Sequence, residues 1–329
     1  MSNELKDGWG RVIEYLRISV TDRCDFRCVY CMTETMKFMP RDELLTLEEI
    51  VEIVHALIPA GLRKVRITGG EPLLRRNVVN LVATLSSLGA LREIALTTNG
   101  SHLAAYALAL RQAGLDSVNI SLDSLRPDRF QEITRFGYLP DVLEGLDAAR
   151  RAGIPRLRIN AVIMRGRNDD EIVDLAKFAA LHGSDMVYIE EMPLGDITEH
   201  DRHALYMSSD EVINVLQQYA GPWLPCSYVT GGPARYFQHA ATGQKIGVIS
   251  PHSHNFCETC NRVRLSAEGR LYLCLGHEHS LDLRAVLREQ GAAAILPSVQ
   301  QALLSKPRRH EFNLEQPVTL RRTMNITGG

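Results

Sequence analysis

Residues 15–20, Tyr15-Leu-Arg-Ile-Ser-Val20, lead after a short gap into Cys24-Asp-Phe-Arg-Cys28-Val-Tyr-Cys31. The first stretch is apolar and short enough to be a buried parallel strand. The second stretch spaces three cysteines as C-x3-C-x2-C, whereas a four-iron cluster or a structural zinc site normally takes four protein ligands. Three thiolates leave one metal position open, and an open position is where an exogenous molecule binds to a metal.

Five further short runs rich in Val, Ile and Leu follow, and helical patterns separate them. We expect strands at residues 15–20, 64–68, 93–97, 117–121, 156–162 and 186–190. Capping-box patterns at Thr46 and Ser208 predict helix starts, and Asn168 offers a similar start. Glycines follow several helical runs, where a left-handed cap favours them: Gly61, Gly89, Gly114, Gly153 and Gly183.

Six β/α units before about residue 220 predict a parallel sheet with right-handed crossovers. A closed TIM barrel needs eight units, so six predict an α/β fold with an incomplete (β/α)6 TIM-type barrel. A doubly wound, Rossmann-like sheet is the alternative, and periodicity does not separate the two. Turn-rich sequence after Gly221 marks a boundary near residue 222. We therefore expect an N-terminal segment (1–13), a barrel (14–222) and a C-terminal extension (223–329) that carries a second cluster and closes the barrel.

The composition is that of an ordinary soluble protein, with 329 residues, 45% hydrophobic and 23% charged. A net charge of -2 gives no indication of nucleic acid or an anionic membrane as partner. The N-terminus lacks the apolar core of a signal peptide, and no apolar run is long enough to span a bilayer. The seven cysteines fall into two triplets and the single Cys226, which indicates metal binding rather than disulfides. We expect a cytoplasmic protein.

Polar residues follow the predicted strands, and ligands of parallel β/α folds bind at the carboxyl ends of strands. The second strand ends in Thr68-Gly69-Gly70-Glu71-Pro72, where glycine permits close approach of the backbone to a ligand. Further polar residues at the ends of the other strands are Thr97, Ser121, Asp123, Arg158, Asn160, Glu190 and Glu191.

The cysteine spacing, with Tyr30 before the last cysteine, and the Gly-Gly-Glu-Pro motif together resemble the radical S-adenosylmethionine (SAM) superfamily. The resemblance implies a [4Fe-4S] cluster on Cys24, Cys28 and Cys31, whose open iron chelates the amino and carboxylate groups of SAM. It also implies SAM contacts from Tyr30, Gly70, Ser121 and Met192. The alternatives are a zinc-binding turn for the cysteines and core packing for Met192.

A second triplet, Cys257, Cys260 and Cys274, has a C-x2-C-x13-C spacing that also suits zinc. The fourth zinc ligand would then be His254, His277 or Cys226. Arg262 and Arg264 follow directly and project from the same side of an extended chain, where paired guanidiniums bind phosphate oxygens. Arg17 and Arg66 lie on predicted strands, so a polyanion between the two cysteine sites would account for all four arginines.

The double cysteine set, Asn261-Arg262-Val263-Arg264 and the terminal Gly328-Gly329 narrow the resemblance to the radical SAM enzymes that cyclise GTP in molybdenum cofactor biosynthesis. This resemblance implies a second [4Fe-4S] cluster whose open iron holds the guanine. It implies that a 5′-deoxyadenosyl radical takes hydrogen from C3′ of GTP, after which C3′ bonds to C8 of guanine. Its product is (8S)-3′,8-cyclo-7,8-dihydroguanosine 5′-triphosphate. The GTP contacts that it implies are Arg17, Arg66, Thr97, Arg158, Arg262 and Arg264.

Two positions carry further implications of the resemblance. The family pattern has lysine where this chain has Arg158, so a planar fork replaces a point charge. The terminal pair, Gly328 and Gly329, would reach into the active site and act in catalysis, whereas the plain alternative is a frayed tail.

The partners implied are GTP as substrate, an electron donor, a homodimer mate and, through the product, a downstream cyclic pyranopterin monophosphate synthase. Nucleic acid and membrane are not expected. One alternative is another two-cluster radical SAM enzyme that acts on a peptide or small molecule. The other is an electron carrier or a zinc-stabilised binding module, although a carrier would have closed four-cysteine sites where this chain has two triplets.

Overall fold

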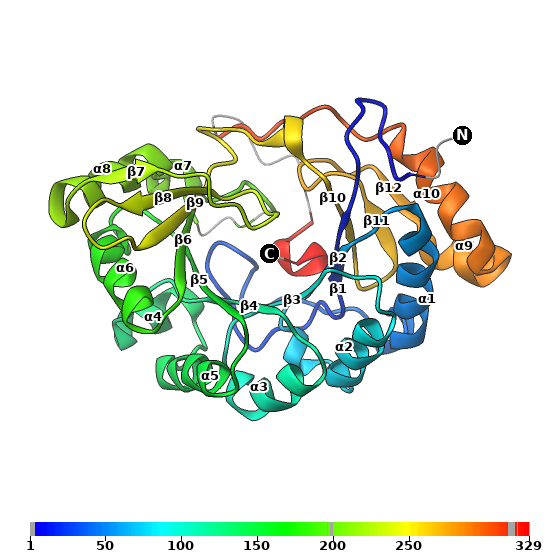
Figure 1. The fold of residues 1–329 in the computed structure, drawn as a ribbon, viewed down its shortest axis with the longest axis horizontal. Coiled ribbons are helices and arrows are strands. Elements are labelled where there is room, and N and C mark those ends of the chain that lie inside the picture. Colours follow the sequence, from blue (N-terminus) through cyan, green and yellow to red (C-terminus); the bar gives the residue numbers. More distant parts are fainter. Residues whose placement is uncertain (1–3, 196, 198–199, 315–319, 321, 329) are drawn as a thin grey trace.

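The structure is a computed structural model that describes residues 4–195, 197, 200–314, 320 and 322–328. Within these residues, twelve strands form one mixed sheet in the order β12-β11-β10-β1-β2-β3-β4-β5-β6-β9-β8-β7. The sheet curves around the C-terminal helix, and most helices cover its outer face (Figure 1). The chain thus has an α/β fold with a single curved sheet.

Six parallel strands form the centre of the sheet, each joined to the next through helical segments. They are β1 (Tyr15–Ser19), β2 (Lys64–Thr68), β3 (Glu93–Thr98), β4 (Ser117–Ser121), β5 (Arg156–Val162) and β6 (Asp185–Ile189). The helices after them are α1 (Leu47–Leu57), α2 (Val78–Ser87), α3 (Leu103–Gln112), α4 (Pro127–Thr134), α5 (Leu139–Arg151), α6 (Ile172–Leu181), α7 (Arg202–Leu205) and α8 (Ser209–Ala220). All six strands predicted from sequence are present, with ends that differ by at most one residue.

The residues after β6 extend both edges of this sheet. On one side, β9 (Lys245–Ile249) runs parallel to β6 and continues into β8 (Arg235–His239) and β7 (Trp223–Pro225). On the other side, β10 (Arg262–Leu265) runs parallel to β1 and continues into β11 (Arg270–Tyr272) and β12 (Ser280–Asp282). The helices of this part are α9 (Leu283–Gln290), α10 (Ile295–Leu303) and α11 (Met324–Thr327).

Helix ends follow the predicted capping patterns with one exception. Thr46 and Ser208 each form a complete capping box at the start of α1 and α8. Asn168 precedes a 3-10 turn but does not cap it, because its side chain bonds Met164 N, Asp123 O and Val162 O instead. The predicted cap glycines all have positive φ, as their positions after helices require.

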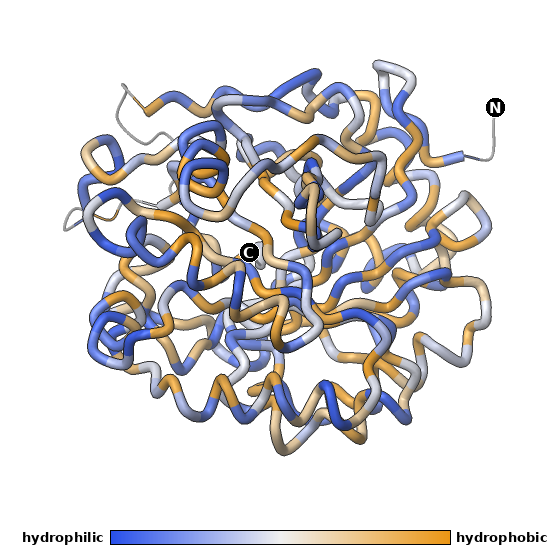
Figure 2. Tube along the Cα trace, turned by 60° about the vertical axis from the view of Figure 1, so that its left-hand side comes forward, coloured by the Kyte–Doolittle hydropathy of each residue, from blue (hydrophilic) through white to orange (hydrophobic). Residues whose placement is uncertain are grey.

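The two faces of the central strands differ in polarity. Alternate residues such as Leu16, Ile18, Val65 and Ile67 belong to the hydrophobic core under the outer helices. Along those helices, hydrophobic and hydrophilic residues alternate, as Figure 2 shows. The intervening strand residues, Tyr15 and Arg17 among them, line a cavity on the concave face. The strands thereby supply a core on one side and a polar site on the other.

Among the described residues, no helix is long and apolar enough to cross a membrane.

Candidate active site

The first cysteine triplet lies in the loop after β1. Cys24, Cys28 and Cys31 line one pocket together with Gly70 and Ser121. Burial raises the pKa of the Cys24 and Cys28 thiols well above their ordinary value, and it raises the pKa of Cys31 to about 12. A bound metal that deprotonates the thiols outright would offset this cost of ionisation.

The glycine pair after β2 packs directly on the chain that leads to this loop. Gly70 N donates to Thr21 O at 2.8 Å, and a Cβ on Gly70 would lie 2.3 Å from Arg23 O. Gly69 has φ +153°, and a Cβ there would lie 2.4 Å from Thr21 O. Both positions therefore require glycine for close backbone approach, which places the Gly-Gly turn against the cysteine loop.

Glu71 ties three loops of the site together. Its buried carboxylate accepts hydrogen bonds from Leu73 N at 3.0 Å, Thr98 Oγ1 at 2.8 Å and Asn99 N at 2.7 Å. Burial raises the pKa of Glu71 to about 7. Asn99 in turn donates to Asp25 Oδ1 at 2.7 Å, next to Cys24, so the loops after β2 and β3 fix the cysteine loop.

Tyr30 and Asp123 form a hydrogen bond beside the first triplet. Tyr30 OH donates to Asp123 Oδ2 at 2.7 Å, and Val162 N donates to Asp123 Oδ1 at 2.8 Å. Burial raises the pKa of Asp123 to about 6. The residues predicted to contact SAM lie in two neighbouring pockets beside this bond. Tyr30 and Ser121 line both pockets. Gly70 lines the pocket that holds the first triplet, and Met192 lines the pocket next to it.

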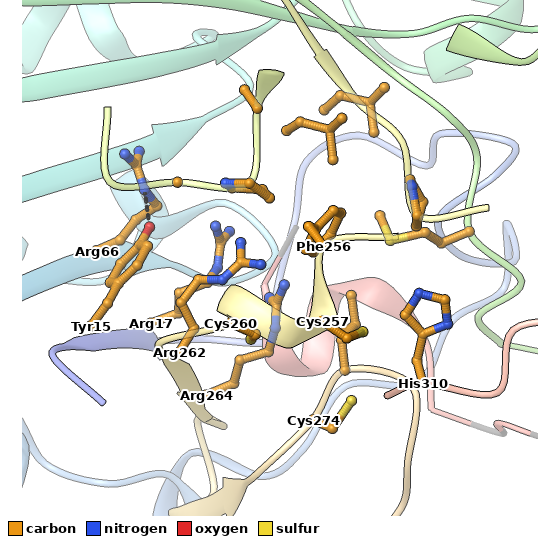
Figure 3. Close-up of a pocket in the computed structure, with 18 of the residues that line it drawn as sticks. Tyr15, Arg17, Arg66, Phe256, Cys257, Cys260, Arg262, Arg264, Cys274 and His310 are labelled. Carbon is orange, nitrogen blue, oxygen red and sulfur yellow. Dashed lines mark hydrogen bonds between the residues drawn. The ribbon is translucent and has the colours of Figure 1, made fainter. Parts of the chain in front are cut away.

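The second triplet lines a larger cavity on the same concave face. Cys257 and Cys260 lie in and after the 3-10 turn Cys257–Thr259, and Cys274 follows β11 (Figure 3). The seven cysteines are all free thiols. In the described part of the chain, no set of three or more His, Cys, Asp or Glu side chains is arranged to hold one metal ion.

The three residues considered as a fourth zinc ligand lie outside the described lining of this cavity. His254 Nε2 lies 2.8 Å from Asp210 Oδ2, and His277 Nε2 bonds Arg309 O at 3.1 Å. A different histidine, His310, lines the cavity near Cys257 (Figure 3). Its Nε2 atom is buried and has no hydrogen-bond partner among the described residues.

Three adjacent strands carry a grid of cations between the two triplets. In the register of β10, β1 and β2, Arg262, Tyr15 and Lys64 form one row. Arg264, Arg17 and Arg66 form the next row on the same face. We call these six residues the cation grid. Figure 3 shows Arg17, Arg262 and Arg264 between Tyr15 and the second triplet, where paired guanidiniums can bind phosphate oxygens.

Thr97 and Arg158 line the same cavity as the grid. Thr97 also lines the pocket of the first triplet and the pocket next to it, so it lies where the two sites meet. Arg158 Nε lies 3.7 Å from Asp185 Oδ2, while Arg158 Nη2 is buried without a hydrogen-bond partner among the described residues. The structure therefore brings all six predicted GTP contacts to one cavity.

The C-terminal tail enters this cavity region from the end of α11, which packs against β1. Arg264 Nη1 donates to Gly328 O at 2.5 Å, and Asn325 Nδ2 donates to Asp22 O at 2.8 Å. Gly328 has φ +72°, and a Cβ there would lie 2.1 Å from Thr68 Cγ2. Gly328 is thus held in the interior, whereas Gly329 lies outside the described residues.

Several residues that line the cavity were not predicted from the sequence. Tyr15 and Lys64 each lie two residues before a predicted arginine on the same strand. This i, i+2 spacing places them on the same face as the arginine and could have indicated that they line the cavity. Lys306 and His310 come from the region after α10, and no local pattern relates them to the cysteines. Asn119 was missed too; like Asn160, which was predicted at a strand end, it carries a buried side-chain oxygen without a hydrogen-bond partner among the described residues, as expected of groups that meet a ligand.

Family comparisons agree with this arrangement. The radical SAM superfamily matches residues 18–179, and the family described as Molybdenum Cofactor Synthesis C matches residues 184–312. A relative named GTP 3′,8-cyclase 1 from Pseudomonas aeruginosa is 53% identical over 98% of each chain. GTP 3′,8-cyclase from Pseudomonas entomophila is 51% identical over 99% of this chain and 98% of its own.

Solved structures share the fold at much lower identity. The crystal structure of Streptococcus suis SuiB has a TM-score of 0.59 and 13% identity, over 96% of this chain and 78% of its own. The same protein bound to S-adenosylmethionine gives a TM-score of 0.59 and 13% identity, over 83% of this chain and 64% of its own. The fold and the near full-length relatives give one conclusion: the chain belongs to the GTP 3′,8-cyclase family of the radical SAM superfamily.

Proposed function

We propose that this protein converts GTP to (8S)-3′,8-cyclo-7,8-dihydroguanosine 5′-triphosphate, the first step of molybdenum cofactor biosynthesis. The observation that carries the proposal is the cation grid, which lies in one cavity with the second cysteine triplet and meets the pocket of the first triplet at Thr97. A substrate with a polyphosphate at one end and a base at the other fits this cavity, because the polyphosphate can bind the cation grid while the base lies at the second triplet. Sequence identities of 51% and 53% to proteins named GTP 3′,8-cyclase support the same substrate.

The cofactors fit the donor groups present. Each triplet offers three free thiols to one pocket, which suits a [4Fe-4S] cluster with one open iron. Cys24, Cys28 and Cys31 would hold the cluster that binds SAM, and Cys257, Cys260 and Cys274 would hold the second. When bound, the reduced first cluster and SAM supply the radical that abstracts hydrogen from the substrate.

The chain's own residues then orient the substrate. The arginines of the cation grid bind the triphosphate, and Thr97 lies where the ribose would face the SAM pocket. The guanine would lie beside the second triplet, near Phe256 and His310. The Gly328 carbonyl accepts a hydrogen bond from Arg264, so the tail would help to hold this guanidinium in place. Holding reactants in one geometry in this way supplies a large part of a rate enhancement.

Four features of this proposal concern the wider molecule. We interpret the six central β/α units as an incomplete (β/α)6 barrel, whose edges the C-terminal extension prolongs. The first cluster would take its electrons from a separate donor, and the active form would be a homodimer. The product would pass to a cyclic pyranopterin monophosphate synthase.

Replacing Arg17 by Met tests the triphosphate site. Arg17 stands in the grid between Arg264 and Arg66, and its loss removes a charge-assisted contact worth about 1.5–3 kcal/mol. We therefore expect the Kd for GTP, measured by calorimetry, to rise about 10- to 150-fold. SAM binding should stay unchanged, because Arg17 is not among the residues that line the SAM pocket.

The matched control is Arg270→Met on β11, an arginine that is outside the described lining of the cavity. This variant should bind GTP as the parent does and should make the cyclised product when given SAM and a strong reductant without oxygen. A parent protein that binds no GTP, or an Arg17 variant that binds it with parental affinity, would refute the proposed site.

A further inference from the structure

Tyr15 is the one acid within the cation grid. It lies between Arg262 on β10 and Lys64 on β2, and its side chain is buried. Arg66 Nε donates to Tyr15 OH at 2.7 Å (Figure 3), and Lys64 Nζ lies 4.9 Å from the centre of the ring. The phenol oxygen is therefore an acceptor pointed at a guanidinium.

Positive groups face Tyr15 from every strand packed against it. Arg17 lies on its own strand, Lys64 and Arg66 on β2, and Arg262 and Arg264 on β10. Among the described residues that line the cavity, none is an aspartate or a glutamate. Glu93, on β3 beyond β2, pairs with Lys64 at 2.8 Å.

Burial alone would raise the pKa of Tyr15 and keep the phenol neutral. The positive charges of Arg66, Arg17 and Lys64 outweigh burial and lower that pKa from its ordinary value near 10 to about 7. The second tyrosine of the cavity, Tyr236, behaves in the opposite way, because burial raises its pKa. The geometry thus singles out Tyr15 as a group that can carry a negative charge among these cations.

We propose that, above neutral pH, Tyr15 is ionised while the cation grid lacks a substrate and takes up one proton from solvent when a triphosphate binds there. This inference rests on the proposed function, because it identifies the triphosphate of GTP as the ligand that displaces the negative charge. Phosphate oxygens bring several negative charges to the same guanidiniums, and like charges at close range disfavour the phenolate. Protonated Tyr15 keeps its role as acceptor for Arg66, so the grid retains its shape.

The proton linkage sets the pH dependence of binding. Below the pKa of free Tyr15 the phenol is already protonated, so affinity does not change with pH on its account. Above about pH 7 each binding event must take a proton from solvent, and the Kd should rise by about tenfold per pH unit. Without the phenol, this slope disappears.

The test measures proton uptake when inorganic triphosphate or GTP binds to the cluster-loaded protein near pH 8, where phosphate groups with a second pKa of about 6 are already ionised. Calorimetry in two buffers with different ionisation enthalpies gives the number of protons taken up. Inorganic triphosphate adds no ultraviolet absorbance, so a difference spectrum reports loss of tyrosinate. We expect about one proton and loss of one tyrosinate in the parent, and neither in Tyr15→Phe.

The matched control is Tyr236→Phe, which removes the hydroxyl of the other cavity tyrosine and should retain the parental proton uptake. Parent protein that binds triphosphate with no proton uptake and no tyrosinate signal overturns the inference and leaves the proposed function intact. Uptake that persists in Tyr15→Phe assigns the proton to another group, such as a neutral Lys64 amine that becomes protonated, and also overturns the inference. Absence of GTP binding at every pH would instead contradict the proposed function. The spectrum of the parent decides the matter even if Tyr15→Phe folds poorly.

Discussion

Gly328→Ala is expected to lower the rate of cyclisation by about a hundredfold or more, while both cysteine sites keep their iron. Gly328 has φ +72°, and a Cβ would lie 2.1 Å from Thr68 Cγ2. The tail would have to withdraw, which breaks the 2.5 Å bond from Arg264 Nη1 to Gly328 O. A small displacement of groups beside the reacting atoms is enough for a loss of this size. Deletion of Gly328 and Gly329 should have the same effect.

The control for this prediction is Gly183→Ala. Gly183 has a similar φ of +63°, but a Cβ there meets nothing within 4 Å. It should therefore carry the same backbone strain without a clash and retain parental activity. Product formation is measured by chromatography after anaerobic incubation with GTP and SAM. If Gly328→Ala cyclises GTP at the parental rate, the tail has no part in the reaction.

Replacing Cys257, Cys260 and Cys274 together by Ala is expected to halve the iron content and to abolish the product. Two four-iron clusters correspond to about eight irons per chain, and the variant should keep about four on the first triplet. SAM binding should persist, because Cys24, Cys28 and Cys31 line a separate pocket. Metal analysis by mass spectrometry and SAM titration measure these two quantities.

Cys226→Ala is the matched control, since Cys226 is a free thiol outside the described lining of both triplet pockets. It should keep the full iron content and full activity. A parent protein with one zinc and about four irons would contradict the second cluster. His310, the histidine that the fold brings to this cavity, would then be the first candidate for a zinc ligand.

The sequence is sufficient to predict the six central strands, because each is a short apolar run between helix signals. The side of the sheet on which their polar residues lie was harder to predict. Arg17 and Arg66 interrupt apolar runs, and only the curved sheet shows that they share the concave face with Tyr15 and Lys64. Local pattern thus indicates a strand but does not identify the side that faces a ligand.

The partner of β1 on its outer side could not be predicted from local sequence. β10 pairs with β1 in parallel register, although some 240 residues separate Arg17 from its neighbour Arg264. That pairing creates the cation grid and places the second triplet beside it. The same holds for Lys306 and His310, whose positions depend on the packing of the C-terminal region rather than on any pattern around them.

The central claim is that one cavity holds GTP with its ribose facing the SAM pocket. The most direct measurement is the mass of the 5′-deoxyadenosine formed in a single turnover with GTP deuterated at C3′. We expect 5′-deoxyadenosine to form in step with the cyclised product and to carry one deuterium from the substrate. Formation of unlabelled 5′-deoxyadenosine, or of the same amount when GTP is left out, would contradict it.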